Sequence, residues 1–287
     1  MPAILSTLRA TLGDVEFNTR DDDGVTWGLE KLSGWGSPAS TLSLTQKPRD
    51  HGAWGDGPAY LTPRVLAASG TIEAPTPALA WQAHDRLCRA VALDPVRLTV
   101  HEAERDRWCM VQRDDEVIPD WITDRAFEWS AQLVAKDPRK YGDPITATVG
   151  LPSSSGGLTW PVAWPIRWDA STTSGVLHIY NPGDIPVPVK MRIDSGALPL
   201  DGPFIRHDGA GVELVLSSAY TLGAGSWLDV DTGRKWVLEG GTASRNGWIV
   251  KRGWFRLDPG PNDFIFGNAG AYTAAASLTL TATPAWQ

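Results

Sequence analysis

Cysteine is scarce in this chain, which has only Cys88 and Cys109 among its 287 residues. Two cysteines are too few for a disulfide framework, and we interpret both as small buried hydrophobic residues made in a reducing compartment. No N-terminal segment joins a basic head to an apolar core, and no apolar run reaches the roughly 18 residues of a membrane span. We therefore expect neither a secretory signal nor a transmembrane helix.

The short motifs of common enzyme and metal sites are also missing. There is no GxSxG, HExxH, GxxxxGK[ST] or CxxC pattern. The segment from Asp229 to Gly233 begins like a calcium loop, but Gly233 takes the third ligand position and Gly240 replaces the bidentate glutamate. We interpret that segment as a polar strand end and predict no catalytic, cofactor-binding or metal-binding residues.

The five histidines offer no better candidate site. His207 and Asp208 are adjacent, and neighbours on an extended chain point apart, so we expect a surface loop and not a base with its orienting carboxylate. His101, Glu102 and Glu104 are expected on a solvated strand face. His51 is a lone polar group in a glycine-rich stretch, and structural positions are expected for His84 on the helix and His178 on a strand.

Glycine, proline and tryptophan are plentiful, with 29, 22 and 15 residues. Many turn formers together with many strand-compatible aromatic residues indicate an all-β chain. Tryptophan side chains also stack on sugar rings, so contact between the second half and carbohydrate stays open as an alternative. We interpret most of the tryptophans as core or interface anchors.

The clearest strand pattern occupies residues 127–136 and stops at Asp137-Pro138. One face of it is apolar and the other polar, with Val134 as the only mismatch. A second alternating segment covers residues 64–74, and further strands are expected at 96–100 and 108–112, with an acidic turn at 114–116. The apolar face of the clearest strand consists of Phe127, Trp129, Ala131, Leu133 and Ala135.

One helix is predicted, over about residues 77–93. Thr76 can cap it, and Pro77 suits the first helical position because its missing N–H needs no partner there. Asp94-Pro95 is expected to end it. The apolar residues at helical spacing are Trp81, Leu87, Cys88 and Val91.

Composition divides the chain into a first domain at 1–149, a linker or arm at 150–168 and a second domain at 169–287. Residues 28–63 are rich in glycine and proline and indicate long loops around short strands. Residues 1–145 hold 16 Lys and Arg against 22 Asp and Glu, a net charge of −6, whereas residues 146–287 hold 10 against 11. The second domain alternates in short strands at 187–194, 212–216, 228–231 and 277–282, as in a sandwich or barrel.

Several weak motifs follow one another in a recognisable order. Phe127 precedes Asp137-Pro138 and Tyr141, a Gly/Ser stretch leads to Gly157–Pro161, and Asn181-Pro182-Gly183-Asp184 heads a strand. The last is the segment from Leu257 to Asn262. This order resembles the distal tail proteins of long-tailed bacteriophages, the siphovirus tail-component family.

The resemblance implies a mainly β protein with two domains. The first is a β-sandwich or barrel-like ring domain with one helix, and the second is a galectin-like β-sandwich of jelly-roll type. Six copies form a hexameric ring, the baseplate hub, which joins the tail tube to the tail tip and anchors host-adsorption parts. The family carries no catalytic residues, and its members are made in the host cytoplasm and reside in the virion.

The partners implied are further copies of the chain, the tail tube protein, the tape measure and tail-tip proteins, and receptor-binding proteins. A host-surface glycan is a further candidate, and DNA passes through the lumen without specific binding. The loops of residues 28–63 are candidate arms between copies, although the pattern singles out no interface residues. The alternative is a monomeric two-domain module that binds carbohydrate or a cell surface, and an enzyme is the third possibility.

Overall fold

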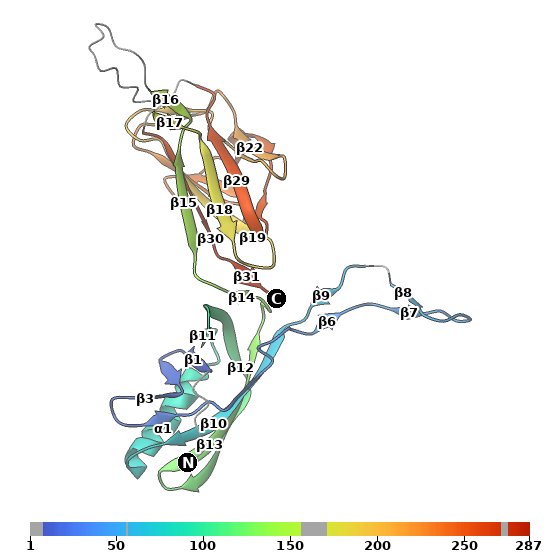
Figure 1. The fold of residues 1–287 in the computed structure, drawn as a ribbon, viewed down its shortest axis with the longest axis vertical. Helices are drawn as coiled ribbons and strands as arrows, with labels where there is room; N and C mark the ends of the chain where they lie inside the picture. The colour runs from blue at the N-terminus through green and yellow to red at the C-terminus, as the bar shows by residue number, and fades with distance from the viewer. Residues whose placement is uncertain (1–7, 56, 156–170, 271–274) are drawn as a thin grey trace, which may run out of the picture. The chain divides into compact units, whose positions relative to one another are not determined.

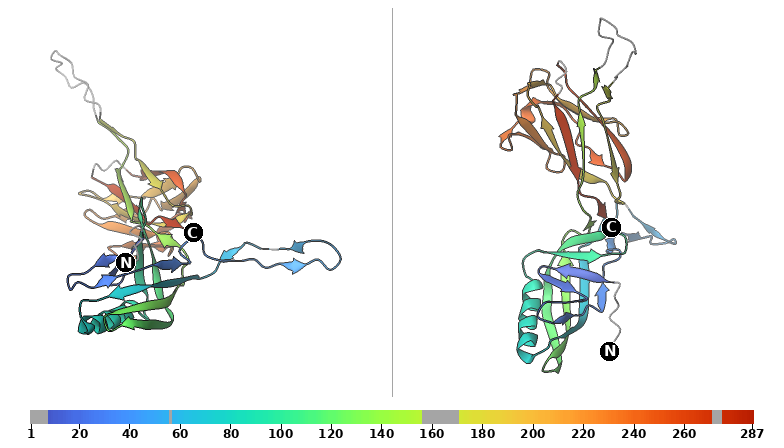
Figure 2. Two further views of the ribbon diagram at one scale, coloured as in Figure 1. Left: turned by 60° about the horizontal axis from the view of Figure 1, so that its bottom comes forward. Right: turned by 60° about the vertical axis from the view of Figure 1, so that its left-hand side comes forward.

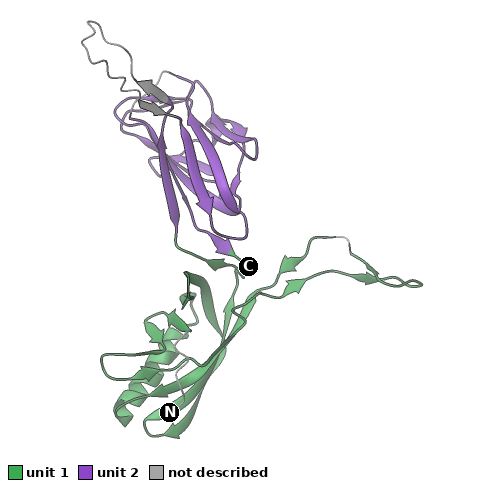
Figure 3. Ribbon diagram, in the orientation of Figure 1, with its two compact units in different colours: residues 1–143, 286–287 green, residues 144–285 purple. Residues whose placement is uncertain are grey.

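The computed structural model describes residues 8–55, 57–155, 171–270 and 275–287. Two compact units make up the chain, one of residues 1–143 with 286–287 and one of residues 144–285 (Figure 3). The division lies at 143/144, ahead of the expected boundary at 149, because β15 (Ile145–Gly150) pairs along its whole length with β30 (Ser277–Ala282). Most of the expected linker at 150–168, including Gly157–Pro161, lies outside the described residues.

The first unit is built on one antiparallel sheet in the order β2-β1-β11-β12-β13-β10-β4-β3 (Figure 1). Two short strands join at its sides, β5 (Lys31–Ser33) on β10 and β14 (Lys140–Tyr141) on β12. The strands of the main path are β1 (Arg9–Leu12), β2 (Val15–Phe17), β3 (Thr19–Arg20), β4 (Thr26–Trp27), β10 (Arg64–Glu73), β11 (Val96–His101), β12 (Asp106–Thr123) and β13 (Ala126–Ala135).

Strand β13 confirms the alternation expected for residues 127–136. Each residue of the expected apolar face is buried, and the mismatch Val134 is half-buried. β13 pairs with β10 over ten consecutive positions, from Arg64↔Ala135 to Glu73↔Ala126. Their inner faces form the centre of the core, which β1, β2 and the helix complete.

Two glycines allow the chain to cross itself at this core. A Cβ on Gly70 would lie 2.1 Å from the carbonyl oxygen of Gly28, and one on Gly28 would lie 2.5 Å from that of Thr71. The close approach lets the Gly28 N–H donate to Thr71 O at 2.8 Å. Trp129 Nε1 also donates to Gly28 O, at 3.1 Å, so this crossing fixes the position of the loop after β4.

Helix α1 (Pro77–Ala90) packs on one face of the sheet (Figure 2). Thr76 caps it as expected, accepting the Leu79 N–H at 3.3 Å, but the helix ends before residue 93, because Val91 leaves helical geometry at ψ 67°. The predicted apolar face was wrong in part: Trp81 is 57% exposed, and the small residues face the core. The buried residues of the helix are Ala80, Ala83, Leu87 and Ala90. None of the helices in the described residues combines the length and the hydropathy that a membrane crossing requires.

The acidic turn expected at 114–116 is instead a bulge within β12. Pairing with β13 shifts register between Arg113 and Val117, and the strand then continues to Thr123. A bulge leaves the extra residues unpaired and exposed, which explains why a run of acidic residues is tolerated in a strand. The true turn of this hairpin is at Asp124-Arg125.

The second unit is an antiparallel β-sandwich of two main sheets. The first has the order β15-β30-β19-β24-β25-β26, with β28 beside β19, and the second has the order β18-β29-β21-β22-β27. The remaining strands of both sheets are β18 (Val176–Asn181), β19 (Val187–Asp194), β21 (Phe204–His207), β22 (Val212–Leu216), β24 (Trp227–Asp231), β25 (Trp236–Glu239), β26 (Ala243–Ser244), β27 (Ile249–Arg252), β28 (Arg256–Leu257) and β29 (Gly260–Gly267).

Small elements complete the described residues. The pair β20 (Leu200–Asp201) and β23 (Thr221–Leu222) and the pair β16 (Ser153–Ser155) and β17 (Ser171–Thr173) are two-stranded, and a 3-10 turn covers Asn246–Trp248. The last strand is β31 (Ala285–Trp286). The alternation expected at 187–194 is confirmed, because Val187, Val189, Met191 and Ile193 are buried while the residues between them face outward.

Candidate assembly surfaces

A two-stranded arm leaves the first unit between β5 and β10. It consists of β6 (Ser40–Thr41) paired with β9 (Tyr60–Leu61) and of β7 (Thr45–Gln46) paired with β8 (Ala53–Trp54) (Figure 1). This is the segment in which the sequence predicted loops around short strands. Four of its large apolar side chains are more than half exposed: Leu42, Leu44, Trp54 and Tyr60. An isolated hairpin with exposed apolar residues has no core of its own, which makes the arm a candidate contact surface for a partner.

Arg64 holds the base of the arm. Its side chain is 1% exposed, and its Nη1 donates to the carbonyl oxygens of Gly34, Trp35 and Gly36 at 2.8, 2.9 and 2.8 Å. Its Nε donates to Pro138 O at 2.8 Å. Because residues 34–36 enter the arm and Arg64 begins the strand that leaves it, one guanidinium ties together both ends of the arm.

Charged residues around this guanidinium stiffen the same region. Lys140 Nζ donates to Gly36 O at 3.2 Å, and Trp35 Nε1 donates to Glu102 Oε1 at 2.8 Å. Arg107 forms an ion pair with Glu102. Burial opposes ionisation of Glu102, but the hydrogen bonds from Arg107 and Trp35 outweigh it and lower the pKa of this carboxyl. Glu102 therefore lies on a half-buried ion pair, not on the solvated face that was expected.

The outer half of β12 is an open sheet edge. β11 pairs with Asp106–Val111 only, so that beyond the bulge residues 117–123 pair with β13 alone among the described strands. Ile118 and Ile122 on this edge are more than half exposed. Nearby, Trp81 of α1 lies over Trp121 of β12, with their ring centroids 4.5 Å apart. An exposed apolar edge is a template for pairing with another chain.

The Asp-Pro-x-x-Tyr motif forms a hydrogen-bonded turn that ends β13. The Tyr141 hydroxyl donates to Asp137 Oδ2 at 2.6 Å, and the Arg139 N–H donates to Asp137 Oδ1 at 3.2 Å. Pro138 presents its carbonyl to Arg64. The motif therefore connects the end of the clearest strand to the base of the arm.

Two buried asparagines explain the motifs of the second unit. Asn181 Nδ2 donates to the carbonyls of Ile185 and Leu257 at 3.3 and 3.1 Å, and its Oδ1 accepts the Gly183 N–H at 2.9 Å. In the other motif, Asn262 Nδ2 donates to Asp258 O and its Oδ1 accepts the Asp258 N–H. Both side chains replace backbone partners in tight loops, which is a structural role.

We expect Asn181→Asp to destabilise the second unit by about 3 kcal/mol and Asn181→Ala by about 2 kcal/mol, since Asn181 is 1% exposed. The aspartate should be worse although it matches the shape, because its oxygen would face the two carbonyls that now accept from Nδ2. Urea unfolding of both variants measures the difference. Equal stability of Asn181→Asp and the unmutated chain would contradict the stabilising role of the Asn181 hydrogen bonds.

The polar residues singled out by the sequence do not converge. His207 is not on a surface loop: it ends β21, is buried, and stacks on Phe264 with ring centroids 4.6 Å apart, while Asp208 is exposed. His101 pairs with Asp106 at 2.9 Å, and His178 pairs with Asp263 at 2.6 Å. His84 lies among the aromatic rings near Trp81 and Phe127, and His51 is exposed in the arm.

The calcium-like segment does not form a loop of converging carboxylates. Asp229 forms an ion pair with Arg192, and Asp231 Oδ1 accepts the N–H groups of Gly233 and Arg234, both at 2.9 Å. No group of three potential metal ligands occurs in the described ranges.

Cys109 should be unreactive in the folded protein. Its side chain is fully buried in the first unit, and burial raises the pKa of its thiol to about 11. At pH 8 that leaves on the order of one thiolate per thousand molecules. In a Cys88→Ser variant we expect no measurable reaction with a disulfide reagent until guanidinium unfolds the chain. Rapid labelling of the native variant would show that Cys109 is accessible.

The sequence and the fold were compared with known proteins. No family model matches the sequence, and no curated protein matches it either. Among solved structures, the Dit protein of phage SPP1 is similar over 98% of this chain and 99% of its own, with a TM-score of 0.68 and 11% identity. The chain has the fold of a phage Dit protein.

A second phage structure is also similar to this chain. A chain of the phage P2 baseplate, in its activated conformation with calcium, is similar over 96% of this chain and 98% of its own, with a TM-score of 0.50 and 11% identity. The SPP1 protein is described as a paradigm of the hub adsorption apparatus in phages that infect Gram-positive bacteria. Because the likeness covers both units, it confirms the mainly β fold expected from the sequence.

Proposed function

We propose that this chain is a distal tail protein, a structural virion component whose copies form the hub ring between the tail tube and the tail tip of a long-tailed phage. The observation that carries the proposal is the fold shared with SPP1 Dit along essentially the whole of both chains. The described residues do contain two contacts between a nucleophile and a histidine, Cys88 Sγ to His84 Nε2 at 3.7 Å and Thr11 Oγ1 to His101 Nε2 at 3.1 Å. Burial raises the pKa of the Cys88 thiol, which disfavours its use as a nucleophile, so the shared fold and not an absence of polar pairs supports the structural role.

In this ring each first unit supplies an arm to a neighbouring copy. The arm brings Leu42, Leu44 and Trp54, which have no core of their own, and the neighbour offers the open edge of β12 with Ile118 and Ile122. Pairing the two would cover both apolar surfaces and remove an exposed edge. The hydrogen bonds of Arg64 at the base of the arm would connect the arm rigidly to β10 and, through it, to β13.

The acidic first unit suits a channel for DNA. With a net charge of −6 over residues 1–145, its ring would repel phosphates and leave no adhesive site in the lumen. The second unit, with a net charge of −1, is the domain that would meet the tail-tip and receptor-binding proteins. A reconstruction of the tail tip with a basic lumen would contradict this part of the proposal.

The test is the assembly state and its place in the particle. Native mass measurement of the purified chain should give a multiple of the 31.1 kDa subunit, with six as the expected number. Antibody labelling of tails should mark the junction between tube and tip. A monomer that is absent from purified particles would instead favour the alternative, a two-domain module that binds carbohydrate or a cell surface.

A further inference from the structure

The outward face of the first sheet of the second unit carries side chains in register across five strands. One row runs Thr146, Thr281, Lys190, Asp231 and Trp236, on β15, β30, β19, β24 and β25. The row beside it contains Thr148, Thr279, Arg192 and Asp229. Directly opposed residues on one face of an antiparallel sheet have their Cβ atoms about 4.5–5.5 Å apart, so these groups form a continuous surface.

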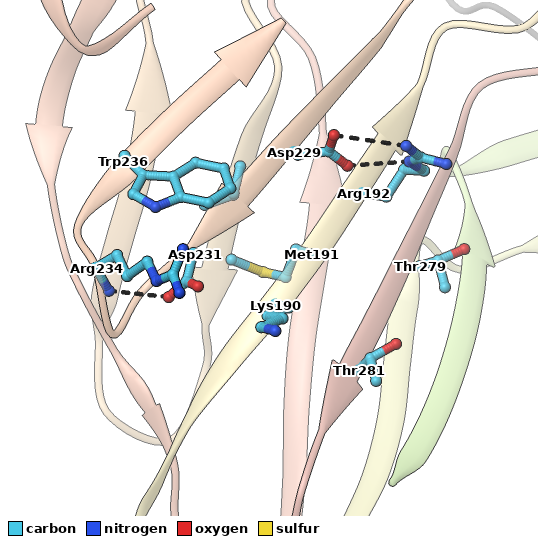
Figure 4. A pocket seen from close by; sticks show the side chains of 10 residues that line it. Lys190, Met191, Arg192, Asp229, Asp231, Arg234, Trp236, Thr279 and Thr281 are labelled. Carbon is cyan, nitrogen blue, oxygen red and sulfur yellow. Dashed lines mark hydrogen bonds and ion pairs between the residues drawn. The ribbon is translucent and has the colours of Figure 1, made fainter. Parts of the chain in front are cut away.

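This face is hollowed where the two rows pass β19 and β24. The hollow has a volume of about 380 Å³, within the range of roughly 300–1,000 Å³ typical of small-molecule sites. Figure 4 shows Trp236 and Arg234 on one side of it, Lys190 at its centre and the hydroxyls of Thr279 and Thr281 on the other.

The carboxylates of this hollow are already satisfied. Arg192 Nε lies 3.0 Å from Asp229 Oδ1, and the same guanidinium lies over the Trp227 ring at 5.0 Å. Asp231 is buried and accepts two backbone N–H groups through Oδ1. The charge of Asp229 is therefore balanced by Arg192, whereas Asp231 keeps its negative charge and forms no ion pair among the described residues.

Two cations remain without a partner. Lys190 and Arg234 are both exposed, and within the described residues neither side chain has an ion pair or a hydrogen bond. With Lys190, Arg192 and Arg234 against Asp229 and Asp231, the lining of the hollow carries one net positive charge, which favours an anion. The usual alternative, a solvated polar sheet face, does not account for a half-buried tryptophan on the same side of the hollow as Arg234 (Figure 4).

Trp236 and the threonines indicate what kind of anion fits. An indole face in a polar surface offers a flat apolar platform for the C–H face of a sugar ring. The threonines bond in pairs, Thr146 with Thr281 at 3.2 Å and Thr148 with Thr279 at 3.0 Å. Each hydroxyl has one donor and two acceptor positions, so each pair keeps capacity for a ligand hydroxyl.

We propose that this hollow is a binding site for an acidic saccharide, a sugar that carries a carboxylate or a phosphate. The sugar ring stacks on Trp236, the acidic group lies between Lys190 and Arg234, and ring hydroxyls bond Thr279 and Thr281. The site is complete within one copy of the second unit, so it depends neither on ring assembly nor on the structural role.

The test is titration of the full chain with glucuronic acid, glucose 6-phosphate, glucose and inorganic phosphate, each followed by calorimetry. We expect at least one of the two acidic sugars to bind about tenfold more tightly than glucose and than phosphate, because both the charge and the ring contribute. The better probe identifies the acidic group. Raising the salt from 0.02 to 0.15 M should weaken this binding, since the charges are exposed.

Matched variants distinguish binding in this hollow from nonspecific attraction of an anion to surface charge. Lys190→Met and Arg234→Met should each weaken the acidic sugar about fivefold, and Trp236→Ala about tenfold. The controls are Lys251→Met and Trp248→Ala, exposed residues of β27 and the adjoining 3-10 turn in the other sheet, which should bind as the unmutated chain does. Thermal melts check that every variant folds.

Three results would overturn the proposal. They are equal affinity for glucose and for both acidic sugars, an affinity for inorganic phosphate equal to that for the better acidic sugar, and unchanged binding in the Lys190, Arg234 and Trp236 variants. A chain that binds none of the four probes at 20 mM would overturn it as well.

Discussion

Shortening the arm should leave a folded chain that no longer assembles. Residues 42–59 can be replaced by Asn-Gly, because Thr41 and Tyr60 are paired and a two-residue turn of this type closes antiparallel strands. The removed residues include Leu42, Leu44 and Trp54, which support no core in the described chain. We expect the native mass to fall from a multiple of 31.1 kDa to a single shortened chain.

A full-length variant distinguishes lost length from lost apolar contact. Leu42, Leu44 and Trp54 changed together to Ser should weaken assembly as strongly as the deletion, since burial of such side chains contributes about 1.5–3 kcal/mol each. Leu198→Ser with Val250→Ser is the matched control, because both are exposed apolar residues of the second unit. Rings that persist in the shortened chain would exclude the arm as the connecting element.

Replacing Arg64 with methionine should have the largest effect on stability in the first unit. The side chain is 1% exposed and satisfies four carbonyl oxygens, those of Gly34, Trp35, Gly36 and Pro138. Leaving several buried acceptors unpaired should cost about 3–5 kcal/mol. For a domain of this size that corresponds to a fall of roughly 6–20 °C in Tm.

Two further variants show whether the stability that Arg64 provides comes from the geometry of its guanidinium or from its charge. Arg64→Lys keeps the charge but lacks the planar fork that reaches several carbonyls at once, so we expect an intermediate loss. Arg125→Met is the control, because that side chain is 60% exposed and pairs only with Asp124, at 3.6 Å. A Tm for Arg64→Met within 2 °C of the control would show that the arm base is held by other contacts.

The resemblance found in the sequence rested on short motifs, and the structure shows which contacts the residues of these motifs make. Asp137 and Tyr141 bond each other, and Asn181 and Asn262 close loops through buried amides. The bonds of Tyr141 with Asp137, of Gly183 with Asn181 and of Asn262 with Asp258 join residues close in sequence, so they form largely independently of the rest of the chain. The bond from Asn181 to Leu257 is a long-range exception. The locality of the other bonds is why weak motifs in a constant order were enough to indicate the fold.

Errors in the sequence interpretation arose where distant segments decide the outcome. His207 was expected on a surface loop, yet β21 pairs with β29 and brings it against Phe264. The acidic run 114–116 was expected as a turn, but pairing with β13 continues beyond it. Trp81 was expected on the buried helix face, which the small residues Ala80 and Ala83 occupy instead because the sheet lies close.

By itself, the sequence determined the β class, the clearest strand at 127–136, the cap of the helix and the division into an acidic and a nearly neutral half. These depend on side-chain period and composition, which are properties of neighbouring residues. Tertiary structure alone decided that Arg64 closes the arm, that β12 keeps an open edge, and that Lys190, Arg234 and Trp236 line one hollow. Strands far apart in the chain bring those groups together, and the register that aligns them is set by pairing across the sheet.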